Sequence, residues 1–546
     1  MLKIRSYTIF ILAALPLLTV GQKNERIQYK ADDLYEFREN GQKIRKLIGN
    51  VIFKQKTTTM YCDSSLYYVR TNTMEAFGRV KIVDDSVTIT SNRLIYDGGD
   101  RTAKLRGNVV YTKGERQMFT DFLDYNMDTE VGNYFNGGRL KDSTNVLTSK
   151  IGYYYAKEDY ALFWNKVSLT APDYTLNSDT LRYNTTTKVA VTPGNTEIVN
   201  EDGSRLYAKG GEFRTLNDQS EFKDGNIETE DYILAGDEMF FDDLNRYYKA
   251  EGNVVLTAKN DNIVIIGNEG YTDKEKNLSK VYGQALMKRV LQNDTLYLAA
   301  DTLVSIESEY DSLERILAYP NVKMWRFDIQ GVADSAAYFL SDSMIFMYKD
   351  PVIWSKKNQI EGDTIQVEIS EEDIKTMTLL QNSFLSSEDT LFNYNQVKGR
   401  TMKAYFEESR IQRIDVSGNG EAIYYVLDEK DSTNIELMGM NRILCSDLTI
   451  RFKNQELNNI SFYKKPEARF IPPHELNQDV QRLKGFQWRI AERPTLEIVL
   501  YKESPIPKGE SEEQTTPSLP PPVKLKMEGL PEGKGTMLKK SKRKQD

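Results

Sequence analysis

The stretch S-V-T-I-T-S-N-R-L-I-Y-D-G-G-D-R-T-A-K-L-R-G-N-V-V-Y-T-K, residues 86–113, contains the pattern that most of this chain repeats. Apolar and polar residues alternate on both sides of the D-G-G-D sequence at 97–100, which is typical of half-buried strands. The two adjacent glycines predict a tight turn with positive φ angles. The stretch therefore indicates an antiparallel hairpin.

Each predicted strand is interrupted at its centre. Ile89 and Leu94 are five residues apart, so a regular strand would place them on opposite faces. A bulge at 91–92 (S-N), and another at 107–108 (G-N) in the returning strand, would bring the apolar residues to one side. We expect strands bent at mid-length, forming V-shaped layers with apolar residues inside the bend.

Two sequence marks repeat along the chain. Gly49-Asn50-Val51, Gly78-Arg79-Val80 and Gly107-Asn108-Val109 follow one another at 29-residue intervals. The partner strand carries a mark of six consecutive positions. They hold, in order, a small residue, Asp or Asn, any residue, Leu or Met, any residue, and an aromatic residue. A fixed period of this size predicts stacked units, here an elongated all-β stack of antiparallel, V-shaped strands. The second position of this mark is occupied by Asn92, Asp121, Lys150, Asp179, Lys209 and Asp237, with looser copies at Asn268, Asp301, Asp334 and Asp363.

Composition divides the chain into five parts. Residues 1–21 resemble a cleaved signal peptide, because Lys3 and Arg5 precede an apolar run that is too short to span a bilayer. We therefore expect an exported product without a transmembrane segment. The expected β repeats occupy 22–173, 174–370 and 371–501, and we expect a strand rather than a short helix at 371–385. Residues 502–546 are rich in Pro and Lys and are expected to be disordered.

The charge distribution argues against nucleic acid as a partner. The whole chain carries −8; residues 1–21 contribute +2 and residues 523–546 contribute +5, so residues 22–522 carry −15. Such an acidic body would repel phosphates. Cys62 and Cys445 are the whole cysteine inventory and lie far apart in the sequence, which favours two free thiols.

The sequence lacks the motifs of the common enzyme classes. His474 is the one histidine, and no G-x-S-x-G elbow, phosphate loop or dinucleotide fingerprint accompanies it. Zinc sites usually draw on several His or Cys ligands, so we expect no metal site, no cofactor and no catalytic residues. The repeated Asp121, Asp179, Asp237 and Asp363 occupy equivalent positions, which favours a structural role at the bend over carbohydrate cleavage.

A line of apolar side chains is predicted to lie inside the bend. It could form a packed core or an open slot for acyl chains, and the residues alone favour the packed core. The candidate lining residues are Val80, Ile82, Val87, Ile89, Leu94, Tyr96, Leu105, Val109, Tyr111, Leu123 and Tyr125.

The G-N-V strand starts and the S-D-x-L-x-Y partners, together with the period and the signal peptide, resemble the OstA-like family. This family includes the lipopolysaccharide-transport proteins LptA and LptC and the N-terminal domain of LptD. The resemblance implies a twisted β-jellyroll, or β-taco, in the periplasm of a Gram-negative cell, free or associated with the outer membrane. It also implies an interior that binds the acyl chains of lipopolysaccharide or lipid A, and edge strands that join other jellyroll proteins.

Two other functions stay open at this point. A structural scaffold of the envelope would have the same repeats with a filled interior and no lipid. A carbohydrate-acting solenoid enzyme would place carboxylates on one face of a similar stack. The transport resemblance favours a non-enzymatic lipid carrier or bridge.

Overall fold

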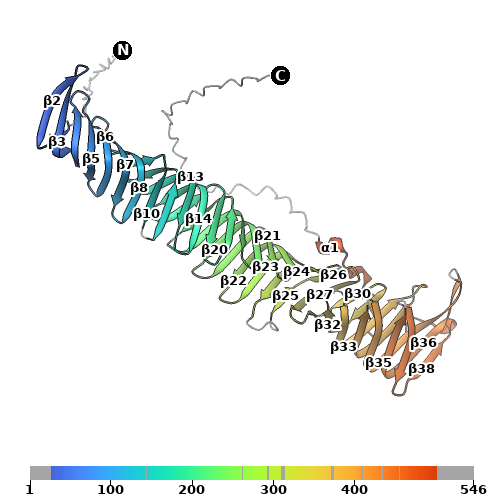
Figure 1. The fold of residues 1–546 in the computed structure, drawn as a ribbon. Helices are drawn as coiled ribbons and strands as arrows, with labels where there is room; N and C mark the ends of the chain where they lie inside the picture. Colours follow the sequence, from blue (N-terminus) through green and yellow to red (C-terminus); the bar gives the residue numbers. More distant parts are fainter. Residues whose placement is uncertain are drawn as a thin grey trace, which may run out of the picture. The chain divides into compact units, whose positions relative to one another are not determined.

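The computed structural model describes residues 26–500, apart from 143, 215, 231, 261, 292–293, 309–313, 371–373, 408–409, 432–433, 454–455 and the side chains of 429–434 and 453–458. The expected signal peptide and the expected disordered tail lie outside the described residues. Within them, antiparallel strands follow one another in a continuous sheet (Figure 1). The all-β stack predicted from the sequence is confirmed.

The strands form three successive groups, which we call the N-terminal, central and C-terminal layers. The N-terminal layers contain β1 Gln28–Lys30, β2 Asp33–Glu39, β3 Gln42–Gln55, β4 Thr58–Tyr68, β5 Thr73–Asp84, β6 Val87–Asp97, β7 Thr102–Lys113, β8 Arg116–Asn126, β9 Val131–Tyr134, β10 Gly138–Asp142, β11 Asn145–Ser149, β12 Ile151–Tyr155 and β13 Tyr160–Thr170. The central layers contain β14 Tyr174–Asn184, β15 Val189–Thr192, β16 Thr196–Asn200, β17 Arg205–Ala208, β18 Gly211–Arg214, β19 Gln219–Glu228, β20 Tyr232–Asp242, β21 Tyr247–Ala258, β22 Ile263–Asp273, β23 Leu278–Val290 and β24 Thr295–Ile306.

The C-terminal layers complete the stack and include the stretch for which a strand was preferred over a helix. That stretch forms most of β33, so the preference is confirmed for its described residues. These layers contain β25 Arg315–Tyr319, β26 Val322–Arg326, β27 Ile329–Ala333, β28 Ser335–Phe339, β29 Met344–Tyr348, β30 Val352–Ser355, β31 Asn358–Glu361, β32 Thr364–Ile369, β33 Ile374–Glu388, β34 Tyr394–Glu407, β35 Arg410–Asp431, β36 Asn434–Lys453, β37 Glu456–Tyr463 and β38 Glu467–Ile471.

The long strands bend where the sequence predicts a bulge. The pairing of β6 with β7 shifts register between Thr90 and Arg93, and the pairing of β7 with β8 shifts between Arg106 and Val109. Gly107 has a φ angle of 76° at this point. Each bend divides a strand into two halves, so neighbouring strands build two arms that enclose an apolar interior.

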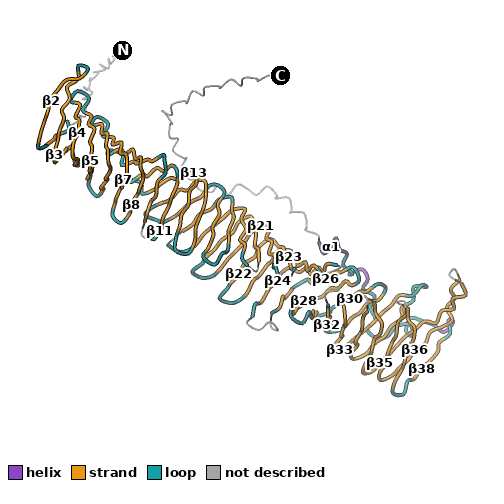
Figure 2. The backbone as a smooth tube through the Cα atoms, viewed as in Figure 1, coloured by secondary structure: helices purple, strands orange, loops and turns teal. Residues whose placement is uncertain are grey.

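We call the two arms A and B. Arm A contains residues 93–97 of β6 with 102–106 of β7, and arm B contains residues 87–90 of β6 with 109–113 of β7. The turns of both arms run along the two long edges of the stack (Figure 2). We call the opening between these two rows of turns the mouth, and the bent centre of the strands the crease.

The expected reason for the two glycines in the D-G-G-D turn is wrong. Neither Gly98 nor Gly99 has a positive φ angle, and Arg101 takes the left-handed conformation instead, with φ of 52°. Asp97 Oδ1 holds the turn by accepting a hydrogen bond of 2.8 Å from the Gly99 backbone N–H. Gly98 is needed for space, because a Cβ there would lie 2.5 Å from the side-chain nitrogen of Asn72 in the adjacent turn.

The repeated acidic position stabilises the crease, as the sequence suggested. Asp121 Oδ1 accepts a hydrogen bond of 3.2 Å from the Asn108 backbone N–H. Asp237 and Asp363 accept instead from the side-chain amides of Asn253 and Asn382, at 2.8 and 3.1 Å. Asp179 occupies the equivalent place, opposite a register shift in the β13–β14 pairing. These contacts explain the repetition without any catalytic role.

The interior between the arms is filled mainly by two apolar clusters. One extends from Ile27 to Val254 and the other from Ile263 to Ile450. Cys62 lies in the first cluster, where burial raises the pKa of its thiol to about 12. Both cysteines are free thiols, as expected.

Residues 472–500 form a segment that does not follow the 29-residue repeat, and we call it the strap. After β38 the strap contains two 3-10 turns, η2 Pro473–Glu475 and η3 Ile490–Glu492, and the short helix α1 Leu496–Leu500. It runs back along the stack, so that α1 contacts β24 and β26 (Figure 1). The strands therefore end at Ile471, ahead of the expected limit at 501.

The strap packs on the outer face of arm B. Leu483 is buried in a third apolar cluster with Phe384, Ile423 and Met440. The Gln359 side chain donates to Gln487 O at 2.6 Å and accepts from the Arg489 N–H at 2.7 Å. Strap side chains add further contacts, since Arg489 Nη1 donates to Asp350 Oδ1 at 2.9 Å and Arg493 Nε donates to Gln330 Oε1 at 2.8 Å.

Candidate functional site

The eleven predicted lining residues all belong to the first apolar cluster. Their exposed fractions lie between 0% for Leu94 and 5% for Val87. Residues from both arms, such as Ile89 of arm B and Leu94 of arm A, therefore pack against one another inside the N-terminal layers. The structure brings these side chains together in a filled interior, and their contact with a lipid stays a prediction.

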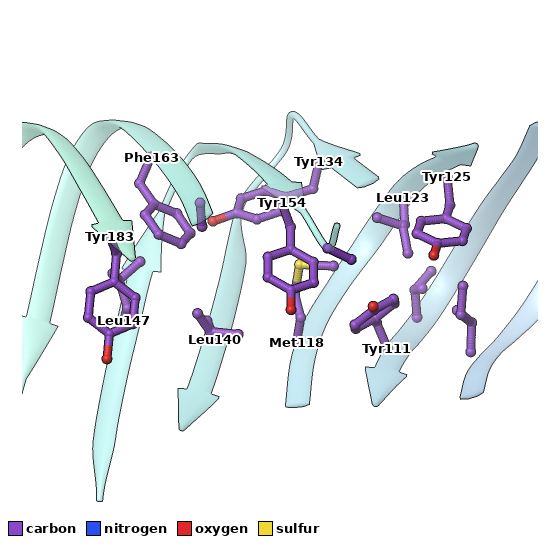
Figure 3. Close-up of a cluster of buried hydrophobic side chains, with 14 of the residues drawn as sticks. Tyr111, Met118, Leu123, Tyr125, Tyr134, Leu140, Leu147, Tyr154, Phe163 and Tyr183 are labelled. Carbon is purple, nitrogen blue, oxygen red and sulfur yellow. The ribbon is translucent and has the colours of Figure 1, made fainter. Parts of the chain in front are cut away.

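A row of tyrosines lies in arm A. The aromatic position of the repeated mark places a buried tyrosine in five successive layers: Tyr67, Tyr96, Tyr125, Tyr154 and Tyr183. Burial raises the pKa of the Tyr96 and Tyr154 hydroxyls above the usual value. Figure 3 shows Tyr125, Tyr154 and Tyr183 among the buried side chains, with Tyr111 of arm B. A tyrosine can place its ring in apolar surroundings while its hydroxyl reaches a polar rim.

Polar contacts cross the mouth of the N-terminal layers near this row. The Tyr96 hydroxyl donates to Gln55 Oε1 at 2.6 Å, and Gln55 Nε2 donates to Gly98 O at 2.9 Å. Arg101, in an arm A turn, donates to Gln55 O at 3.2 Å and to Thr58 Oγ1 at 3.0 Å. Its Nε lies 2.9 Å from Asp128 Oδ1. A buried arginine thus joins the two rows of turns.

The next layers repeat this closure with other residues. Lys113 Nζ of arm B donates to Ala156 O of arm A at 3.2 Å. Arg116 Nη2 donates to Thr185 O at 2.7 Å, and Lys188 forms an ion pair with Asp142 across the mouth. We call this set of cross-mouth contacts, between residues 55 and 188, the lacing.

The central layers contain open space instead. A cavity of about 1090 Å³ lies between the arms, and a second of about 520 Å³ shares Tyr232, Thr272, Lys274, Asn277 and Glu307 with it. The floor of the larger cavity is apolar. It is formed by Tyr174, Ile198, Leu206, Phe213, Phe222, Ile227, Leu234 and Phe241.

The rim of the larger cavity is acidic. Six carboxylates and two cations line it, namely Asp173, Glu201, Asp202, Asp218, Asp243 and Glu307 with Arg246 and Lys274. Burial raises the pKa of Asp243, with further raising contributions from Asp218 and Asp173 and an opposing hydrogen bond from Tyr248. Asp173 belongs to an arm B turn and Asp218 and Asp243 to arm A turns, so like charges face each other across the mouth.

Sequence reasoning did not single out these cavity residues. A signal was nevertheless present, because the aromatic position of the repeated mark changes from tyrosine to Phe213 and Phe241 and then to Thr272 and Ser305. Phenylalanine has no hydroxyl, so it cannot form the hydrogen bond that joins Tyr96 to the opposite arm. The cavity thus begins where the tyrosine row ends.

His474 has no catalytic surroundings in the described residues. It lies in η2 with a side chain that is 79% exposed, and its Nε2 is 3.9 Å from Glu475 Oε1. The described part of the chain contains no group of His, Cys, Asp and Glu side chains arranged to hold a metal ion. None of the helices in the described residues has the length and apolar character needed to span a bilayer.

Comparison with known families fits this architecture. Residues 23–179 match the family model described as OstA-like protein, and residues 289–373 match the model described as LptA/(LptD N-terminal domain) LPS transport protein. The chain is therefore similar to OstA-like and LPS transport proteins over these two parts of its length. The second model describes a transport protein, and neither describes an enzyme. No curated protein matches the chain.

Among solved structures, the chain is similar to LptH, the LptA homologous periplasmic component of the lipopolysaccharide transport device from Pseudomonas aeruginosa. The sequence identity is 15%, the match covers 22% of this chain and 82% of LptH, and the TM-score is 0.19.

The two family matches lie on either side of most of the larger cavity. The eleven predicted lining residues fall in the first match, whereas most of the floor of the larger cavity lies between residues 179 and 289, outside both matches.

Proposed function

We propose that this chain is a periplasmic lipid-binding carrier or bridge of lipopolysaccharide transport, free or associated with the outer membrane. The apolar interior between the two arms, which we call the trough, would hold acyl chains without forming or breaking covalent bonds. The observation that carries the proposal is the cavity of about 1090 Å³ with an apolar floor, inside a trough that is continuous with the packed layers. The family matches support the transport class.

The apolar floor supplies the energy for binding. Burial of acyl chains contributes about 0.8 kcal/mol per CH₂, so a chain of about twelve methylenes would gain about 10 kcal/mol before ordering costs. The cavity is as large as sites that take sizeable ligands, which measure about 300–1,000 Å³. Phe213, Leu234 and Phe241 would contact the acyl chains first. The eleven N-terminal lining residues would contact them when that part of the trough is occupied.

The acidic rim requires a counter-ion for an anionic head group. Carboxylates exceed cations on the rim by six to two, and residues 22–522 as a whole carry a net charge of −15. A divalent cation could bridge phosphate and carboxylate oxygens, since such ions prefer oxygen ligands. We expect capture of lipopolysaccharide to fall when a chelator removes Mg²⁺ and Ca²⁺ from the buffer. Equal capture in the chelator would contradict this account of the rim.

The ends of the stack suit the assembly of jellyroll proteins by edge strands. β2 pairs with β3 alone among the described strands, and Leu34, Tyr35 and Phe37 on it are exposed by 49%, 57% and 41%. β38 pairs with β36 at the other end, where Phe470 is 52% exposed. Exposed apolar edges of this kind favour strand addition by another protein.

A structural scaffold is the second candidate. The packed interior of the N-terminal layers favours it, since the predicted lining residues there are buried against each other. Native mass spectrometry separates the two functions. Co-purifying lipid supports the carrier, and a lipid-free protein that captures nothing from lipid extracts supports the scaffold.

Site-specific photo-crosslinking tests the carrier directly. A photoreactive residue at Leu234 points into the cavity, whereas one at Ile233 lies on the opposite face of the same strand. We expect crosslinks to lipopolysaccharide at Leu234 and none at Ile233. Labelling of both positions to the same extent, or of neither, would refute the binding of lipid in the trough.

A further inference from the structure

Two opposite electrostatic arrangements occur along one mouth. In the lacing, oppositely charged groups meet across the opening, as in the ion pair of Lys188 with Asp142. In the central layers, Asp173 of arm B faces Asp218 and Asp243 of arm A. Opposite charges attract across the mouth and like charges repel. Arg246 and Lys274 of arm A offset part of the repulsion on the central rim, but six carboxylates outnumber these two cations, so charge favours closure in the first region and disfavours it in the second.

The side chains beneath the rim also differ between the two regions, in a way that favours closure of the N-terminal layers and opening of the central layers. In the N-terminal layers, Tyr96 fills the interior and also bonds to Gln55 of the opposite arm. At the matching positions of the central layers, Phe213 and Phe241 line the cavity and have no hydroxyl to offer. The central mouth therefore lacks this hydrogen bond while keeping an apolar floor.

A pair of side chains stands between the two cavities. Lys274 Nζ of arm A lies 5.4 Å from the centre of the Tyr232 ring of arm B, and both residues line both cavities. Lys274 Nζ also lies 3.5 Å from Glu307 of its own arm. A cation–π contact of this kind contributes about 0.5–1 kcal/mol when exposed, so side-chain rotation can open the passage at small cost.

From these observations we propose that the central mouth, between residues 173 and 307, is a lateral port through which an amphiphile with apolar acyl chains enters the trough. The acyl chains pass over the acidic rim onto the apolar floor. The laced N-terminal layers open only afterwards, as the chains advance. The inference rests on the proposed lipid-binding function and adds to it the place and order of loading.

Time-resolved photo-crosslinking tests the order. The photoreactive residue p-benzoylphenylalanine replaces Phe213 in the port, Tyr154 in the laced layers or Tyr338 beyond the second cavity, three buried aromatic positions. Donor vesicles contain phosphatidylethanolamine and purified lipopolysaccharide. We expect Phe213 to be labelled first, with Tyr154 and Tyr338 labelled later or not at all.

The outcomes separate the port from the function. Labelling of Tyr154 or Tyr338 before or together with Phe213 would overturn the port and leave the lipid carrier standing. No labelling at any of the three positions would overturn the carrier itself.

A charge reversal provides the second test. Asp173→Lys would face Asp218 and Asp243 and add an attraction across the mouth, so labelling at Phe213 should slow by about tenfold. Glu238→Lys makes the same change of charge at an exposed residue outside the cavity lining and serves as the control. Equal rates in the two variants, with unchanged unfolding midpoints, would also overturn the port.

Discussion

The N-terminal and central layers have the same repeat and differ in closure. Both bend at a glycine of positive φ, such as Gly78 and Gly252, and both direct apolar side chains inward. The lacing closes the first, and an acidic rim borders a cavity in the second. The apolar lines of the repeat therefore determine the trough, while the turn residues at the mouth determine whether it is closed.

The largest effect that would sharpen this comparison is expected from Arg101→Ala. The Arg101 side chain is 5% exposed, and its loss leaves Asp84 and the Gln55 carbonyl without their cationic partner. Breaking a buried pair costs about 3–5 kcal/mol, so chemical denaturation should show an unfolding transition destabilised by that amount. Arg79→Ala is the matched control, because Arg79 pairs with Asp63 but is 87% exposed, and exposed pairs contribute about 0–1 kcal/mol. Equal effects of the two variants would show that the lacing does not close the mouth.

The C-terminal layers give the comparison a third case, in which the strap stabilises the stack from outside. Gln396 donates to Gln481 O at 2.8 Å and accepts from the Leu483 N–H at 2.8 Å, like Gln359 nearer the centre of the stack. Replacing either glutamine by alanine leaves buried backbone groups unpaired, at about 1–3 kcal/mol each. Hydrogen exchange should show faster exchange of the Leu483 and Arg489 amides in the double variant. Gln366→Ala, on the half-buried face of β32, should leave their exchange unchanged.

Much of the architecture could be predicted because it repeats. Spacings of 29 residues, glycine followed by asparagine, and an acidic residue on the partner strand each have a local physical cause at the crease. The turn at 97–100 shows the limit of such reasoning. The need for Gly98 comes from Asn72 of the adjacent layer and not from its own backbone angles.

The candidate site was harder to predict because its determinants occur once each. Arg101 bonds to Gln55, 46 residues away, and Arg116 bonds to Thr185, 69 residues away, with no periodic mark on either pair. The inward direction of Leu94 follows from alternation, but the packing of its neighbours into a filled interior depends on the separation of the arms. The strap has no copy elsewhere, so a search for repeats could not find its docking surface.

If closure is determined at the mouth, substitutions at the crease should lower stability equally in the N-terminal and central layers. A Cβ at Gly78 or at Gly252 would lie 2.4 Å from the Oδ2 atom of Asp63 or Asp237, and both glycines have positive φ angles. We expect Gly78→Ala and Gly252→Ala each to lower the unfolding free energy by about 1–3 kcal/mol, from backbone strain and displacement of the carboxylate. Gly41 also has a positive φ angle, but no atom lies within 4 Å of the position a Cβ would take. Gly41→Ala should therefore lower the unfolding free energy by about 1 kcal/mol, from backbone strain alone. A clear difference between the two crease variants in thermal or chemical unfolding would mean that the bend also contributes to closure.

The smallest effect concerns the acidic rim and its dependence on pH. Burial raises the folded-state pKa of Asp243 above the ordinary value of 3.8, so the folded protein holds this proton more tightly than the unfolded chain does. Stability from this group is fully present below the ordinary pKa and is lost as the pH rises through the raised value, because deprotonation then favours unfolding. Asp243→Asn removes the titration. Unfolding curves recorded between about pH 4 and pH 7 should therefore show a downward slope for the original chain that is shallower in the variant. Asp202→Asn is a useful contrast, because hydrogen bonds from Ser204 lower the pKa of Asp202 below its ordinary value of 3.8. The stability from Asp202 is lost only as the pH falls below that value, so this variant should differ from the original chain in curves extended below about pH 5 and follow it closely above. Parallel curves for the original chain and Asp243→Asn would mean that the buried Asp243 carboxyl does not contribute to the pH dependence of stability.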